Sequence, residues 1–303
     1  MSGILDDFKD AFSKRNNGLI QLIWLNVAIY IFTLLLFVTF TLFFKGGNLY
    51  YTLLSYVSLS PEPTTLLFRP WTLLTYSFLH HINPIVHIFP NMLMLYWFGS
   101  ILQEYIGSRR LVGLYIVGAI FGAVLAVLAF NFIPYYHQNI ASTSIIGASG
   151  SVMAVVFAAA TLAPDYSFFL FLIGSVRIKY IAFLLLIISL AGSIGANAGG
   201  EIVHLGGAIF GYIYIRQLRA GRDFSTPIEA VIEFFEKLFK RKNEPKIRVA
   251  YRQKEASYSS TASSHSGFPD EEEVDEILDK ISRSGYESLT KEEKQKLFKA
   301  SQK

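Results

Sequence analysis

Long apolar stretches recur along this chain, and they restrict what it can fold into more than any other feature. A helix needs about 20 mainly apolar residues to cross a bilayer. Inside lipid every backbone N–H and C=O group must be paired within the protein, so such stretches should be helical. Hydrophobic residues make up 52% of the chain, more than a soluble domain usually contains. We expect an all-α membrane protein with six spans, at about Leu19–Phe44, Ile85–Leu102, Leu111–Ile133, Ile145–Ala163, Ile178–Leu190 and Ile202–Leu218.

Basic residues occur at alternate ends of these spans. Lys and Arg collect in cytoplasmic loops, and here they cluster before the first span and after the second, fourth and sixth. This pattern predicts an even number of spans with both termini in the cytoplasm. The clusters are Lys9, Lys14 and Arg15; Arg109 and Arg110; Arg177 and Lys179; and Arg216, Arg219 and Arg222.

Three polar residues are expected at one depth below the outer surface. In this topology the second, fourth and sixth spans all begin at the outer face, so depth can be counted from each helix start. Ser149 and His204 each lie about five residues in, and His87 lies about four residues in. At a rise of about 1.5 Å per residue, all three lie on the order of 6 to 8 Å inside the helix ends.

Ser149 and His204 together suffice for acyl transfer. A serine hydroxyl is a weak nucleophile until a base takes its proton, and imidazole can do so near neutral pH. The chain has no cysteine, which excludes a thiol nucleophile. Glu201 precedes His204 by three residues, a spacing that suits helix capping or solvent contact as well as orientation of the imidazole. The sequence therefore predicts a Ser–His dyad.

The same region offers donors for an oxyanion. Backbone N–H groups in the first turn of a helix are unpaired and carry the positive end of the helix dipole, so the Ser149 amide can contribute. In the second span His87 and Asn91 are four residues apart and therefore share one helix face. We expect these three groups to form the oxyanion site.

Simpler structural roles compete with catalysis. The small residues at 147–150 would also serve as a close-packing surface, since small side chains let membrane helices approach. His80, His81 and His87 could suggest a metal site, but no carboxylate or His-Glu-x-x-His pair accompanies them. We therefore expect no metal and no cofactor. What favours catalysis is the joint occurrence of nucleophile, base and donors at matching depth.

A series of separated motifs extends through about residues 20 to 220. They are Arg69-Pro70-Trp71, Phe78-Leu79-His80, His87-x-x-x-Asn91, Glu104 with Gly107, Gly147-x-Ser149-Gly150 and His204-x-x-Gly207-x-x-x-Gly211. This series resembles the rhomboid family of intramembrane serine proteases, in its bacterial form.

The resemblance implies a six-transmembrane-helix rhomboid bundle with Ser149 as nucleophile, His204 as base, and His87, Asn91 and the Ser149 amide as the oxyanion site. It implies cleavage within or beside transmembrane segments of other proteins, with small residues preferred before the scissile bond. The expected location is the cell's inner (plasma) membrane. The first loop, roughly residues 45 to 82, would correspond to the family's partly immersed loop, and the fifth span to its mobile lateral gate.

Three positions depart from the family's usual pattern. Met153, one turn after Ser149, stands where many bacterial rhomboids carry a tyrosine against the histidine ring, although a thioether can still pack there. Arg-Pro-Trp replaces an adjacent Trp-Arg pair. Pro90 directly precedes Asn91 and could kink the second span, which would change the aim of the amide. None of these departures removes a catalytic group.

Composition divides the chain into five segments. Residues 1–17 are a cytoplasmic N-terminal segment, and 18–222 are the six-helix domain. Residues 223–245 predict an amphipathic basic helix, which either lies on the cytoplasmic leaflet or docks on the protein's own spans. A polar, Ser/Thr-rich stretch at 246–269 should be a flexible linker. Residues 270–303 predict a small helical module in the cytoplasm.

This C-terminal module should contain two short helices. Gly285 is a plausible stop for the first, and Thr290-x-x-Glu293 is typical of a capping box that opens the second. The module resembles one appended to rhomboids of the Bacteroidetes type.

Three functions fit this sequence. The first is an intramembrane serine endopeptidase that acts at or near the outer face through Ser149, His204 and an acyl-enzyme, with transmembrane proteins as substrates and the lipid bilayer as its surroundings. The second is a catalytically inactive rhomboid-like scaffold that binds membrane clients, against which the intact Ser149 and His204 argue. The third is a small-solute transporter, disfavoured because no inverted pair of broken helices is evident. No nucleic-acid partner is expected.

Overall fold

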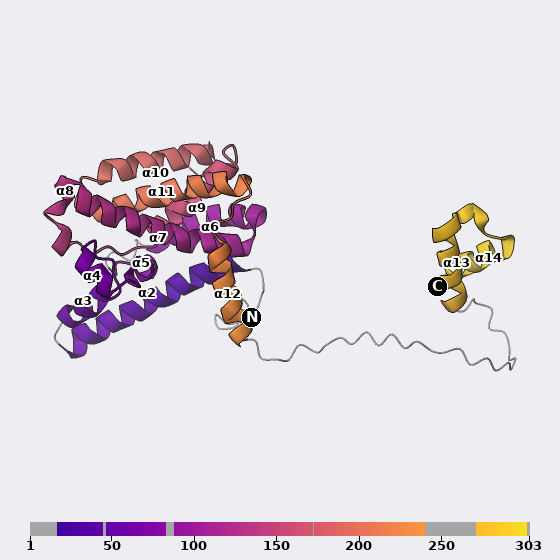
Figure 1. The fold of residues 1–303 in the computed structure, drawn as a ribbon, viewed down its shortest axis with the longest axis horizontal. Helices are drawn as coiled ribbons and strands as arrows, with labels where there is room; N and C mark the ends of the chain where they lie inside the picture. Colours follow the sequence, from indigo (N-terminus) through magenta and orange to yellow (C-terminus); the bar gives the residue numbers. More distant parts are fainter. Residues whose placement is uncertain (1–16, 45–46, 83–87, 172, 240–270, 302–303) are drawn as a thin grey trace. The chain divides into compact units, whose positions relative to one another are not determined.

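The computed structural model describes residues 17–44, 47–82, 88–171, 173–239 and 271–301. The chain divides into two compact units, Met1–Lys242 and Asn243–Lys303. The predicted linker at 246–269 and nearly all of the N-terminal segment lie outside the described residues. In the first unit, a helix overlaps each predicted span (Figure 1): α2 (Gly18–Phe43), α6 (Ile88–Ile106), α7 (Ser108–Phe132), α9 (Ser149–Leu162), α10 (Ile178–Gly192) and α11 (Ala198–Arg219).

The helices differ in whether they could cross a membrane unaided. Among the described helices, α2 and α7 have both the length, 26 and 25 residues, and the hydropathy to do so. α9 and α10 are also apolar, but they contain only 14 and 15 residues. A bilayer of ordinary thickness needs about 20 helical residues. Crossing by all six helices therefore stays a prediction.

α9 lies at the centre of the first unit. It contacts α6, α7, α10 and α11, while α2 packs against α6 and α7. Figure 1 shows α10 beside α11, and α2 at an oblique angle to the other helices. The residues of α9 from Gly150 to Val156 are all buried. The N-terminal end of α9 is thus held within the helix bundle.

Glycines let α9 and α11 approach each other by their backbones. A Cβ atom added at Gly207 would collide with the carbonyl oxygen of Gly150, and one at Gly211 would collide with that of Ala154. Small residues permit this kind of contact between membrane helices. The close packing expected for the small-residue stretch is therefore observed at Gly150, and it fixes the separation of the two helices.

The Arg69-Pro70-Trp71 motif contacts the end of the first helix within the loop that connects α2 and α6. This loop contains α3 (Gly47–Ser55), α4 (Pro63–Phe68), α5 (Thr72–Thr75) and the 3₁₀ turn η1 (Tyr76–Phe78). Arg69 donates to the carbonyl oxygen of Ser55 over 3.1 Å and lies above the Tyr56 ring, 3.9 Å from its centroid. Trp71 Nε1 donates to the carbonyl oxygen of Tyr56 over 2.8 Å.

Backbone hydrogen bonds attach this loop to the segment that enters α9. Leu59 and Ile145 exchange two bonds, of 3.0 and 2.9 Å. Gly147 N–H donates to the carbonyl oxygen of Tyr76 over 3.0 Å. The short turns α8 (Pro134–His137) and η3 (Ile140–Ser142) precede this segment. The start of α9 is therefore held by main-chain contacts as well as by helix packing.

A small hairpin is added to the mostly helical fold. Strands β1 (Ser167–Leu170) and β2 (Gly174–Arg177) pair antiparallel between α9 and α10, with Ser167 opposite Arg177. Phe168 on β1 packs on two aromatic rings of α6, with ring centroids 5.6 Å from Trp97 and 5.1 Å from Phe98. Strands of four residues are too short to be recognised from the sequence pattern. Packing against α6 stabilises the hairpin, because two strands alone are only marginally stable.

The amphipathic helix α12 (Thr226–Phe239) contacts α7. Arg109 in α7 pairs with Glu233 of α12 over 2.7 Å, and Arg110 pairs with Asp223, just before α12, over 2.7 Å. Of the two roles expected for this helix, docking on the protein's own helices is observed, and contact with the leaflet stays a prediction.

The second unit is a short helical hairpin of α13 (Glu271–Ser284), the turn η4 (Tyr286–Ser288) and α14 (Lys291–Ala300). Gly285 has φ of 77° directly after α13, and Thr290 and Glu293 form both bonds of a capping box, so the predicted helix stop and start are confirmed. Ile277 and Leu289 are its buried apolar residues among those described.

Candidate active site

Ser149 is the first residue of α9. Gly147 precedes it with φ of 142°, a backbone conformation that favours glycine. The turn at Gly147 brings the chain into the helix with the Ser149 side chain partly exposed. The hydroxyl thus lies at a helix N-terminus, where backbone N–H groups lack intrahelical partners.

His204 lies in the second turn of α11, and its Nε2 is 2.6 Å from Ser149 Oγ. This is a hydrogen-bonding distance, as a nucleophile and its base require. The His204 side chain is 19% exposed, so it is not sealed inside the protein. The structure brings these two predicted site residues together, and the glycine contact between α9 and α11 explains why they meet.

The other ring nitrogen of His204 also has polar neighbours. Its Nδ1 is 3.0 Å from Glu201 Oε2 and 3.2 Å from the hydroxyl oxygen of Ser189 on α10. The sequence placed Glu201 one turn before His204 but gave equal weight to helix capping. Ser189 carried no sequence signal, because the face that α10 turns towards α11 depends on how the helices pack.

The predicted oxyanion donors are only partly described. Asn91 lies in the first turn of α6 and is 9% exposed, and α6 packs against α9. His87 lies outside the described residues. Pro90 occupies the same first turn, where a missing N–H removes no intrahelical bond. Helix α6 continues without a break from Ile88 to Ile106, so Pro90 does not interrupt it.

The remaining histidines do not gather around a metal position in the described part of the chain. His80 is buried before α6 and stands edge-on to Tyr30, with ring centroids 6.3 Å apart. His81 is exposed. Among the described residues, no group of three His, Cys, Asp or Glu side chains could hold a metal ion.

Met153, the residue that departs from the family pattern one turn after Ser149, is buried in α9 at 5% exposure.

A polar cavity of about 400 Å³ lies between the two loops that lead into α9 and α11. Asn139 and Ser142 line it from one loop and Asn197 from the other, with Ile145 and Gly199 between them. A Cβ atom at Gly199 would come within 2.8 Å of the Ile145 side chain. Glycine there lets the start of α11 lie close to the segment before α9, beside this polar cavity.

Comparison with known families identifies the membrane setting. The model of a family described as "Eukaryotic integral membrane protein (DUF1751)" matches residues 23–291. The chain belongs to this family. It is also similar to "Presenilin-associated rhomboid-like protein A, mitochondrial" of Danio rerio, with 28% identity over 149 residues. That match covers 46% of this chain and 35% of the relative, so it spans about a third of the relative's length.

Membership of the DUF1751 family makes the chain an integral membrane protein, and its relative is rhomboid-like. Both matches carry eukaryotic descriptions, and the relative is named as mitochondrial. Neither supports the bacterial, Bacteroidetes-type assignment or the inner (plasma) membrane location predicted from the sequence. The comparisons therefore support an integral membrane protein that is similar to a rhomboid-like protein.

Proposed function

We propose that this protein is an intramembrane serine endopeptidase that cleaves transmembrane segments of other membrane proteins. The observation that supports it best is the 2.6 Å contact between Ser149 Oγ on α9 and His204 Nε2 on α11. Placing ionisable or polar groups inside a membrane is costly, so such a pair at the predicted depth in the bilayer would indicate a function.

The reaction would follow the usual course of acyl transfer. His204 Nε2 takes the proton of Ser149 Oγ while that oxygen bonds to the scissile carbonyl carbon. The resulting oxyanion would be stabilised by the Ser149 amide at the N-terminus of α9, with Asn91 and His87 as the further predicted donors. His204 then gives its proton to the leaving amine, the C–N bond breaks, and an acyl-enzyme remains.

Hydrolysis of that acyl-enzyme needs water. The polar cavity between the loops before α9 and α11 is large enough to hold several water molecules. With both termini cytoplasmic, as the basic residues predict, this cavity would open at the outer face. A substrate helix must unwind locally to expose its carbonyl, so segments with helix-breaking residues near the cut should be preferred.

A non-catalytic scaffold is the second candidate. It is favoured by the contact of Gly150 with Gly207, since close helix packing needs no chemistry. That contact accounts for the glycines and leaves the Ser149–His204 pair beside them unexplained. We therefore place the protease first.

Replacing Ser149 with alanine tests the proposal. The S149A variant, purified and reconstituted in liposomes with a transmembrane substrate, should lose all cleavage and all labelling by a fluorophosphonate, while its thermal denaturation stays that of the parent. His204→Ala should also remain unlabelled, because the hydroxyl is not activated without its base. Ser100→Ala, an exposed serine whose hydroxyl donates to the Tyr96 carbonyl oxygen within α6, is the matched control and should label normally. A parent that neither cleaves nor labels would leave the scaffold as the better account.

A further inference from the structure

Glu201 lies where it can orient His204. Its Oε2 is 3.0 Å from His204 Nδ1, and the two side chains are 17% and 19% exposed. At this distance the imidazole Nδ1–H can donate to the carboxylate. Donation from Nδ1 fixes the tautomer in which Nε2 has a free lone pair, and that nitrogen faces Ser149.

A helix-end role alone does not account for this geometry. Glu201 is in the first turn of α11, where a negative charge is favourable beside the helix dipole. A favourable interaction with the helix dipole requires only that the charge lie near the N-terminus. It does not require the carboxylate to point at His204, nor to be mostly buried between α11 and α10.

Helix α10 supports the carboxylate from the other side. The Ser189 hydroxyl lies 3.2 Å from His204 Nδ1 and also interacts with the Glu201 side chain. Gly192, one turn further, has no side chain, and a Cβ atom there would lie 2.9 Å from Glu201 Cγ and 3.0 Å from its Cδ. The space that Glu201 occupies therefore exists because residue 192 is glycine.

We infer that Glu201 is the positioning residue of His204, and that Ser189 and Gly192 of α10 keep its carboxylate in place. This inference rests on the proposed protease function. It extends the predicted dyad to a Ser–His–Glu arrangement in which Glu201 touches neither substrate nor reacting atoms. During attack the carboxylate would stabilise the imidazolium that forms when His204 takes the proton of Ser149.

The first experiment compares Glu201→Gln and Glu201→Asp with the parent in liposomes. E201Q should lower kcat by at least about 10-fold, with KM within about 2-fold of the parent value, because orientation of the base matters in the transition state and not in substrate binding. E201D keeps the charge on a shorter side chain and should recover part of the loss. Fluorophosphonate labelling of Ser149 should slow in the same order.

The second experiment changes a residue of α10 that packs against Glu201 and measures the effect on kcat. Gly192→Ala should displace the carboxylate and lower kcat, although it touches neither Ser149 nor His204. In the E201Q background the same change should cost no further activity, because coupled residues are not additive. Ser193→Ala, whose hydroxyl donates to the Leu190 carbonyl within α10, is the matched control and should leave kcat unchanged.

The outcomes separate this inference from the proposed function. A parent that neither cleaves nor labels overturns both. An active parent with an equally active E201Q variant overturns the role of Glu201 and leaves the protease intact. Loss of activity in E201Q with a raised KM, a lowered melting temperature and no recovery in E201D would show a structural role, and would also overturn the inference.

Discussion

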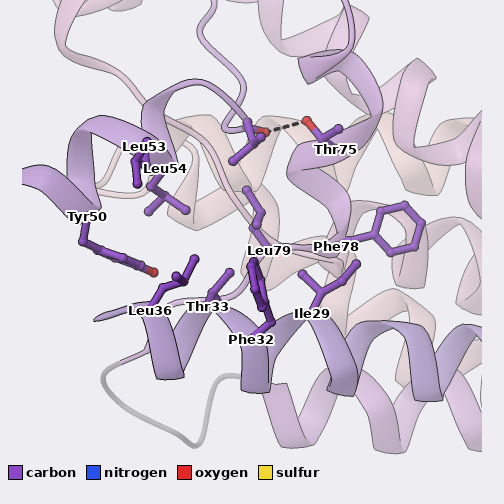
Figure 2. A pocket seen from close by; sticks show the side chains of 11 residues that line it. Ile29, Phe32, Thr33, Leu36, Tyr50, Leu53, Leu54, Thr75, Phe78 and Leu79 are labelled. Atoms are coloured by element: carbon purple, nitrogen blue, oxygen red, sulfur yellow. Dashed lines mark hydrogen bonds between the residues drawn. The ribbon is translucent and has the colours of Figure 1, made fainter. Parts of the chain in front are cut away.

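The contact between α9 and α11 and the contact between α2 and the first loop are built in opposite ways. In the first, backbones touch at glycines and no added side-chain atom fits. In the second, side chains of α2, α3 and η1 line an open apolar pocket of about 410 Å³ (Figure 2). Two of its lining residues are joined by a hydrogen bond of 2.6 Å from the Thr75 hydroxyl to the Val57 carbonyl oxygen (Figure 2).

The difference shows where position matters in this protein. Ser149 and His204 lie at the tight contact, where a shift of either helix would separate the two atoms that must exchange a proton. Tightly packed regions respond strongly to added volume, whereas open regions accept it. Substitutions that add volume should therefore lower activity and stability most where the packing is tightest. Three such changes test this comparison.

Gly207→Ala should have the largest effect of the three. Its methyl group would collide with the Gly150 carbonyl, so α11 would have to move away from α9. A displacement of about 1 Å can cost on the order of 100-fold in activity, and overpacking of this kind costs about 1 to 3 kcal/mol of stability. Cleavage assays and thermal denaturation in detergent measure the two effects. Ile209→Ala, exposed on the same helix, is the control, and equal behaviour of the two variants would contradict the tight contact.

Gly118→Ala should have an intermediate effect. A Cβ atom at this position in α7 would lie 2.6 Å from the Cβ of Ala154 in α9, so the clash is with a methyl group. We expect a loss of about 1 kcal/mol in unfolding free energy, at the lower end of overpacking costs. Activity should fall by less than in Gly207→Ala. A greater fall would mean that the α7–α9 contact controls the site more than the α9–α11 contact does.

Leu54→Phe should have the smallest effect. The larger ring enters the open pocket beside α2, so we expect unfolding free energy and cleavage to change by no more than about 0.5 kcal/mol. The matched change Leu95→Phe, at a fully buried position of α6, should cost about 1 to 3 kcal/mol. If Leu54→Phe destabilised the protein as much as Leu95→Phe, the pocket would not be able to accommodate a larger side chain.

The sequence predicted the helices and the central pair for identifiable reasons. Apolar runs mark helices in lipid, and counting residues from the outer face placed Ser149 and His204 at one depth. The sequence could not show whether Glu201 orients His204 or caps the helix, because a spacing of three residues fits both roles. Ser189 and the β1–β2 hairpin were missed, since both depend on which faces of separate helices meet. The six spans, the catalytic roles and the part played by His87 remain predictions.

The bonds between Leu59 and Ile145, and between Gly147 and Tyr76, run through main-chain atoms alone. These hydrogen bonds do not depend on which side chains stand at Leu59 and Tyr76, although both side chains are buried in the core and the Tyr76 hydroxyl also donates to the Ala119 carbonyl oxygen. A homologue that conserves the main-chain path can then retain the entry to α9 even where the exposed residues of its loops differ. Among distant members of this family, the spacing of the glycines should outlast the identity of the residues that surround them.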